Sequence, residues 1–117
     1  MTDGGRRTGV YAIDLNGDRA SYPNLRSLLM GTLRRLSERD GGFLDRLAGE
    51  KARTRRVVAR SPDALFDKPG LADRYAAELA DGWWVNTNNS KEQTKRWLIA
   101  AVRCAGLDPS TQLKLSF

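Results

Sequence analysis

Two clusters of polar side chains have the types and spacing that suit contacts with nucleic acid. The first cluster, Arg53-Thr54-Arg55-Arg56, precedes a β-branched run, and the second, Thr87-Asn88-Asn89-Ser90, follows an aromatic one. Arg and Lys bind phosphates, while Asn pairs with the edge of adenine and Arg with the edge of guanine in the major groove. If the two runs are neighbouring strands, both clusters lie at one edge of a sheet. This arrangement would give a DNA-binding surface.

The same residues also have an interpretation that involves no ligand. Asn and Ser favour turns and helix starts for local reasons, so Thr87 to Ser90 alone is more typical of a capped turn than of a binding site. A basic run such as Lys51 to Arg60 is often only a solvated face. The presence of both clusters in one chain shifts the balance toward DNA, and both interpretations stay open.

Composition narrows the class of function. The net charge is +6, and residues 1–60 hold 13 Lys and Arg against 7 Asp and Glu, whereas residues 61–117 hold 7 against 7. The chain has no His, which excludes a His-based catalytic dyad or zinc ligand. The single Cys104 is expected to fill the core. The acidic residues are scattered without a metal-binding or phosphate-loop motif, so we expect no catalysis, cofactor or metal.

Hydropathy gives no sign of a membrane segment or signal peptide, because no apolar run approaches the roughly 20 residues of a span. With one cysteine and therefore no internal disulfide, we expect a cytoplasmic protein. A length of 117 residues predicts a single domain over 9–117, preceded by a disordered Gly- and Arg-rich segment, 1–8.

Secondary structure is expected to begin with a β-hairpin over 9–22, because Asn16-Gly17 is typical of a type I′ turn. The core, 24–117, then starts with a helix capped by Asn24 and ending near Arg39, with a leucine-rich buried stripe. A short second helix is expected over 42–50. A lone hairpin is marginal, so it must pack on the helices or pair with another strand, in this chain or in a partner.

Further elements are predicted along the rest of the chain. They are a strand near 55–59, a short helix after Ser61-Pro62, a helix from Leu71 to about Ala80, a strand over 83–87, a helix over 91–105 capped by Ser90, a turn at Asp108-Pro109-Ser110, and a last strand over 113–117. Alternation places Trp83 and Trp84 on opposite faces of their strand, and Trp97 on the apolar face of its helix. The fold class is therefore α+β, with four to five helices, a small antiparallel sheet and the N-terminal hairpin.

The order of these motifs resembles the C-terminal DNA-binding domain of the replication-sequestration protein SeqA. The resemblance spans roughly residues 25–112 and depends on Arg53-Thr54-Arg55 before a strand, Ser61 to Phe66, Trp83-Trp84-Val85, Thr87-Asn88 and a helix ending in Ala105-Gly106-Leu107. It implies a SeqA-like domain that binds hemimethylated G-A-T-C sites in duplex DNA. It also implies that Arg53, Thr54 and Arg55 contact backbone and groove, and that Thr87, Asn88 and Asn89 form the contacting loop.

Departures from the family pattern affect the implied specificity more than DNA binding itself. Ser90 stands where the family has its second loop Asn, Arg56 replaces an apolar strand residue, and Glu92 places a negative charge where the family is neutral or basic. The family's N-terminal oligomerisation domain has no counterpart, and the 9–22 hairpin takes its position. A different site or another modified base is consistent with these changes.

The leading hypothesis is a non-catalytic regulator that binds duplex DNA, hemimethylated or otherwise modified, with sensitivity to sequence or methylation. Its residues would be Arg53, Thr54, Arg55, Arg56, Thr87, Asn88, Asn89, Ser90 and Lys91. The alternative is a small regulatory protein-interaction module that grips a protein partner, or a second copy in a homodimer, through the hairpin edge or the basic face. RNA binding is a third hypothesis, although no regular aromatic pair of an RNA-recognition strand is evident.

Overall fold

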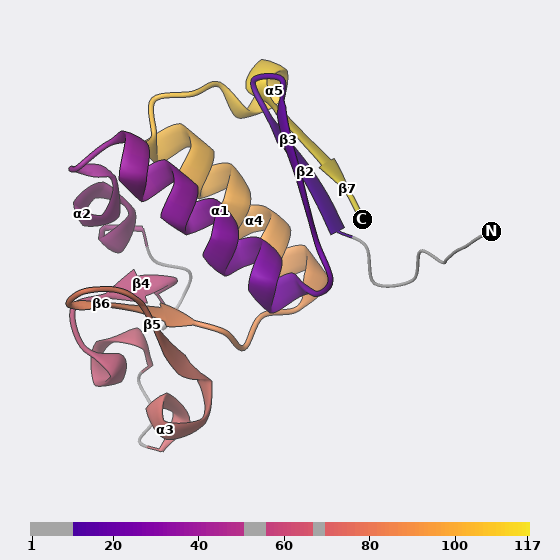
Figure 1. Cartoon of the computed structure of the whole chain (residues 1–117). Coiled ribbons are helices and arrows are strands. Elements are labelled where there is room, and N and C mark those ends of the chain that lie inside the picture. Colours follow the sequence, from indigo (N-terminus) through magenta and orange to yellow (C-terminus); the bar gives the residue numbers. More distant parts are fainter. Residues whose placement is uncertain (1–10, 51–55, 67–69) are drawn as a thin grey trace.

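The computed structural model describes residues 11–50, 56–66 and 70–117. The expected disordered segment 1–8 and the residues Arg53, Thr54 and Arg55 lie outside the described residues. Within them the fold is α+β, as predicted, with five α-helices and two three-stranded antiparallel sheets (Figure 1). The helices are α1 (Leu25–Arg39), α2 (Phe43–Ala48), α3 (Leu71–Tyr75), α4 (Lys91–Cys104) and α5 (Pro109–Gln112), with a 3-10 helix, η1, over Pro62–Leu65.

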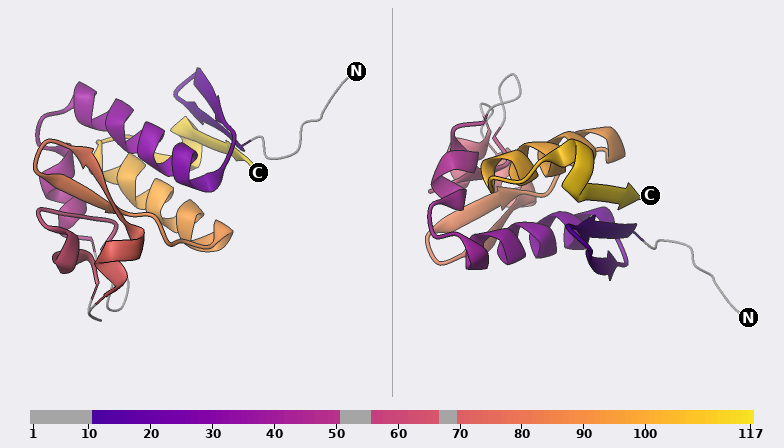
Figure 2. Two further views of the ribbon diagram at one scale, coloured as in Figure 1. Left: turned by 60° about the horizontal axis from the view of Figure 1, so that its bottom comes forward. Right: turned by 90° about the horizontal axis from the view of Figure 1, so that it is seen from above.

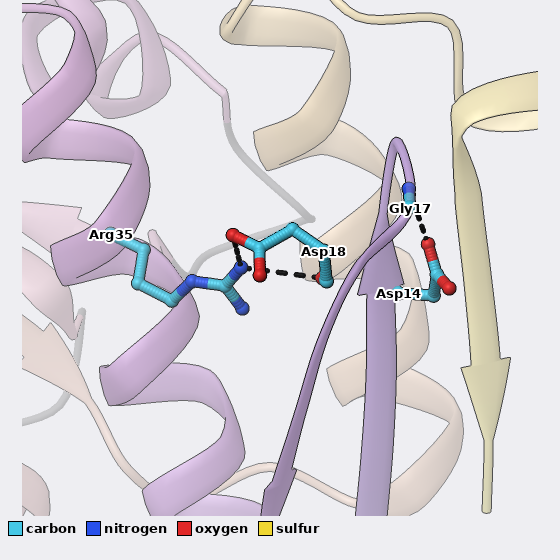
Figure 3. Close-up of polar contacts among 4 residues, drawn as sticks. All are labelled: Asp14, Gly17, Asp18 and Arg35. Atoms are coloured by element: carbon cyan, nitrogen blue, oxygen red, sulfur yellow. Dashed lines mark hydrogen bonds and ion pairs between the residues drawn. The ribbon is translucent and has the colours of Figure 1, made fainter.

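The predicted hairpin is present as strands β2 (Tyr11–Leu15) and β3 (Asp18–Tyr22). Asn16 and Gly17 at its turn have φ of 53° and 91°, the positive values that a type I′ turn requires. Asp14 supports the turn, because its carboxylate accepts a hydrogen bond of 2.7 Å from the Gly17 N–H (Figure 3).

The last strand, β7 (Leu113–Ser116), pairs with β2 of this hairpin. The strand order is β3-β2-β7, with Ile13 opposite Leu115. The α5 helix, where only a turn was expected, is capped by Asp108 and brings the chain back beside the hairpin turn, where the Asn16 N–H donates to the Gln112 carbonyl. Alternation alone predicted that 113–117 is a strand, but it carries no information on the partner.

Two long helices form the middle of the molecule. Asn24 caps α1 by accepting from the Ser27 N–H at 2.8 Å, and Ser90 caps α4 by accepting from the Gln93 N–H at 3.0 Å, as predicted. The helices pack side by side and start at the same end of the molecule (Figures 1 and 2). The predicted stripe of α1 is buried from Leu28 to Leu36, and Gly106 ends α4 with a φ of 82°.

An ion pair fastens the hairpin to α1. The Arg35 guanidinium donates to the Asp18 carboxylate at 2.7 Å and to the Asp18 carbonyl at 3.3 Å (Figure 3). Nearby, the Tyr22 ring lies so close to Gly31 of α1 that a side chain at Gly31 would collide with it. The Tyr22 ring therefore occupies the space that the missing side chain of Gly31 leaves.

The second sheet has the strand order β4-β6-β5, with β4 (Val58–Ala59), β5 (Ala76–Ala80) and β6 (Trp83–Asn86). The predicted helix from Leu71 to Ala80 is wrong in its second half, because α3 ends at Tyr75 and β5 follows. Ala, Glu and Leu favour a helix locally, but propensity is a weak prior. The turn at Gly82, with a φ of 76°, lets Ala76–Ala80 pair with β6 and buries Leu79 in the core.

The central strand β6 contributes to two separate groups of packed side chains. Trp83 and Val85 face the main core between the helix pair and the sheets, together with Trp97 of α4. Trp84 packs on the opposite side against a smaller group formed by Ala59, Leu65, Phe66 and Ala72. The opposite orientation of Trp83 and Trp84 is confirmed, and both rings serve packing.

The β5–β6 turn gives a test of this pairing. Gly82→Ala should lower the free energy of unfolding by about 1–2 kcal/mol, because a left-handed φ is unfavourable for alanine. Gly41→Ala is the matched control: its φ is not positive and an added Cβ would meet no atom within 4 Å. Urea unfolding followed by tryptophan fluorescence measures both variants. Equal stability of the two variants would contradict the assigned turn.

Candidate functional site

The start of β4 and the end of β6 lie side by side, which is the condition that the two polar clusters needed. Val58 pairs with Val85, and the Asn86 N–H donates to the Val57 carbonyl at 2.9 Å. Extending this antiparallel register places the backbone of Arg56 beside Thr87. The chain that leads into β4 and the loop that leaves β6 therefore share one edge of the sheet. Arg56 is the described member of the first cluster.

Thr87 is tied to the other neighbouring strand. Its backbone N–H and its hydroxyl both donate to the Tyr75 carbonyl, at 2.8 and 2.7 Å. These two bonds continue the β5–β6 pairing by one residue and fix where the loop begins. The hydroxyl proton of Thr87 is therefore used within the fold.

Asn86, which was predicted to lie in the strand and was not a candidate site residue, organises the backbone at Asn88. It is fully buried, and its side-chain oxygen accepts from the Asn88 N–H at 2.8 Å, which forms a tight polar turn. The Asn86 side-chain nitrogen has no hydrogen-bond partner among the described residues. Asn88 follows this turn and is half-buried. Its position is therefore set by a buried side chain.

Asn89 uses both ends of its amide inside the protein. Its side-chain nitrogen donates to the Asn86 carbonyl at 2.7 Å, and its side-chain oxygen accepts from the Trp97 indole N–H at 3.0 Å. Trp97 is only 3% exposed, so its N–H needs an internal acceptor. A paired contact to adenine requires the same amide oxygen and N–H. Asn89 is thus better suited to holding the loop on α4 than to reading a base.

Ser90 and Lys91 form the start of α4. The Ser90 hydroxyl caps the helix, and its carbonyl accepts from the Thr94 hydroxyl at 2.8 Å. Both Ser90 and Lys91 are exposed, and so is Glu92 in the same turn. The helix start favours an anion through its dipole, whereas Glu92 opposes one.

Two basic residues near the loop were not identified from the sequence as candidates. A small depression is lined by Arg26 of α1 together with Thr87 and Asn89. Arg74 precedes Tyr75, whose carbonyl holds Thr87. Sequence spacing carries no signal for either residue, because α1 and the chain that enters β5 meet the loop only through tertiary packing.

Cys104 is half-buried near the end of α4 and packs against the main core. Burial raises the pKa of its thiol, so the neutral form dominates at neutral pH. Among residues 11–50, 56–66 and 70–117, no cluster of three acidic or cysteine side chains could hold a metal ion.

Comparisons with models of protein families, with curated proteins and with solved structures find no match to this chain. In the described part of the chain, no helix is long and apolar enough to cross a membrane.

The contact between Asn89 and Trp97 can be tested by unfolding. Asn89→Ala should lower the free energy of unfolding by about 1–3 kcal/mol, because it leaves the buried indole N–H without an acceptor. In a Trp97→Phe background, which lacks that N–H, the same substitution should cost less. Chemical denaturation of the four proteins in this cycle measures the difference. An equal cost in both backgrounds would show that the hydrogen bond does not stabilise the loop.

Proposed function

We propose that this protein binds duplex DNA without catalysis, with sensitivity to sequence or methylation. The observation that carries the proposal is the pairing of β4 with β6, because it brings the chain after the Arg-rich cluster beside the Asn-bearing loop. Cations and amide groups at one edge are the combination that positions a protein on phosphates and reads base edges. A cytoplasmic location is part of this proposal.

Each residue of the surface has a proposed role. Arg53, Thr54 and Arg55 would make backbone and groove contacts, and Arg56 and Lys91 would contact phosphates. Asn88 is the proposed base-reading residue, because the turn that Asn86 organises fixes its backbone beside the chain that enters β4. Thr87, Asn89 and Ser90 would hold this turn in place through the bonds to Tyr75, Trp97 and the start of α4.

The resemblance to the SeqA C-terminal domain supports the same assignment. It depends on the order of short motifs, and it makes hemimethylated DNA the first ligand to test. Ser90 and Glu92 are the departures that bear most on specificity, since one shortens a polar side chain and the other adds negative charge near the proposed phosphates. The proposal is therefore duplex DNA binding in general, and it does not specify one methylated site.

A second candidate function is supported by the sheet β3-β2-β7. Within residues 11–50, 56–66 and 70–117, its outer strands β3 and β7 each pair on one side only, with β2. An unpaired strand edge can add a strand from a protein partner or from a second copy. In that case the hairpin would be an interaction element, and the basic face would serve solubility.

One titration separates these functions. The protein is measured against unmethylated, hemimethylated and fully methylated duplexes and against a single-stranded RNA, each at two salt concentrations. Binding to duplexes that weakens with salt supports the proposal, because phosphate contacts release counterions. Tighter binding to the RNA would favour the RNA hypothesis. Absence of binding to any nucleic acid at low salt would overturn both and leave the protein-interaction function.

Two substitutions distinguish positioning from base reading. Arg55→Ala should weaken binding to all duplexes alike and lower the salt slope by about one. Asn88→Ala should reduce the discrimination between sites by about 1–3 kcal/mol, because it removes a paired base contact. Fluorescence anisotropy with matched duplexes measures both effects. If Asn88→Ala reduced binding equally on every duplex, Asn88 would not be a base-reading residue.

A further inference from the structure

Arg26 lies in the first turn of α1, beside the loop that leaves β6. Its side chain is exposed, and it lines a depression with Leu25, Leu29 and Met30 of α1 and with Thr87, Asn89 and Thr94. The α1 and α4 helices start at the same end of the molecule, so this end of α1 faces the same side as the loop (Figure 2). Arg26 thus lines the same depression as Thr87.

Arg74 comes near Thr87 through the chain that enters β5. It is the residue before Tyr75, and the Tyr75 carbonyl accepts both hydrogen bonds from Thr87. The Arg74 guanidinium lies 5.6 Å from the centre of the Tyr75 ring, and the residue is exposed. The loop is therefore bordered by Arg26 from α1 and by Arg74 from the chain that enters β5.

The basic side chains around the loop have no ion pair within the described residues, a property that they share with others such as Arg39 and Arg96. Arg35, Arg46, Arg60 and Arg103 each approach a carboxylate within 4 Å, the limit for an ion pair. In contrast, no carboxylate of the described residues pairs with the basic groups that border the loop, which are Arg26, Arg56, Arg74 and Lys91. Asp73 and Glu92 are the acidic neighbours in sequence, both exposed. The border keeps an excess of positive charge available to an anion.

We propose that the DNA-binding surface extends onto α1 and α3, and that Arg26 and Arg74 contact phosphates near Thr87. The inference depends on the proposed function and adds two anchors that the SeqA-like motifs do not include. Phosphate contacts from different elements fix the orientation of a protein on a duplex. With a cation from each of these elements, the turn at Asn88 would be held in one orientation toward the groove.

The test compares Arg26→Ala and Arg74→Ala with Arg39→Ala. Arg39 is also an exposed arginine of α1, but it lies at the opposite end of the helix, about 20 Å away at 1.5 Å per residue. All three variants lose one charge from an exposed site. Circular dichroism confirms the fold, and a hemimethylated and an unmethylated duplex are titrated at several salt concentrations.

Arg26→Ala and Arg74→Ala should each weaken binding several-fold on both duplexes and reduce the salt slope by about 0.9. Arg39→Ala should leave the slope unchanged, because it acts only through net charge. If the wild-type protein binds and all three variants behave alike, the additional anchors are overturned while the proposed function stands. If the wild-type protein binds no duplex, both proposals fail.

Discussion

Strand β6 is the element on which the rest of the structure depends. It pairs with β4 on one side and β5 on the other, and it packs Trp83 and Val85 into the main core and Trp84 into the smaller group. A strand buried on both faces and paired on both edges has little freedom to shift its register. The loop that follows it therefore starts from a fixed position. This constraint fixes the backbone at the start of the polar segment Thr87 to Ser90.

The loop that follows β6 is stabilised by hydrogen bonds within it and to α4. The Asn86 side chain accepts from the Asn88 N–H, and the Asn89 side chain accepts from the Trp97 indole N–H. The Ser90 hydroxyl caps the start of α4. The two interpretations of Thr87 to Ser90 are consequently compatible, because a well-capped turn can also carry a binding residue. Preorganisation of this kind reduces the entropy that a ligand must remove on binding. The two bonds of the Asn89 amide explain why Asn89 is assigned a supporting role in the loop.

Local rules predicted the parts of the fold in which one short segment determines its own structure. Asn16-Gly17 specified a hairpin, and Asn24 and Ser90 specified where two helices begin. The missed elements depend on distant partners. Residues 76–80 have helical composition but pair with β6, and the strand at 113–116 pairs with β2. In the candidate site, the Asn89–Trp97 bond and the position of Arg26 could not be predicted, because helix packing creates both.

The pairing of β2 with β7 has a consequence for how the chain reaches this fold. Ile13 lies opposite Leu115, so this contact joins residues near the two ends of the chain. Closing so long a loop has a high entropic cost. Until then, one edge of β2 stays unpaired and can accept the β7 segment of another molecule. Exchange of the C-terminal strand between two copies is thus a misassembly that this topology permits, and high concentration during refolding would favour it.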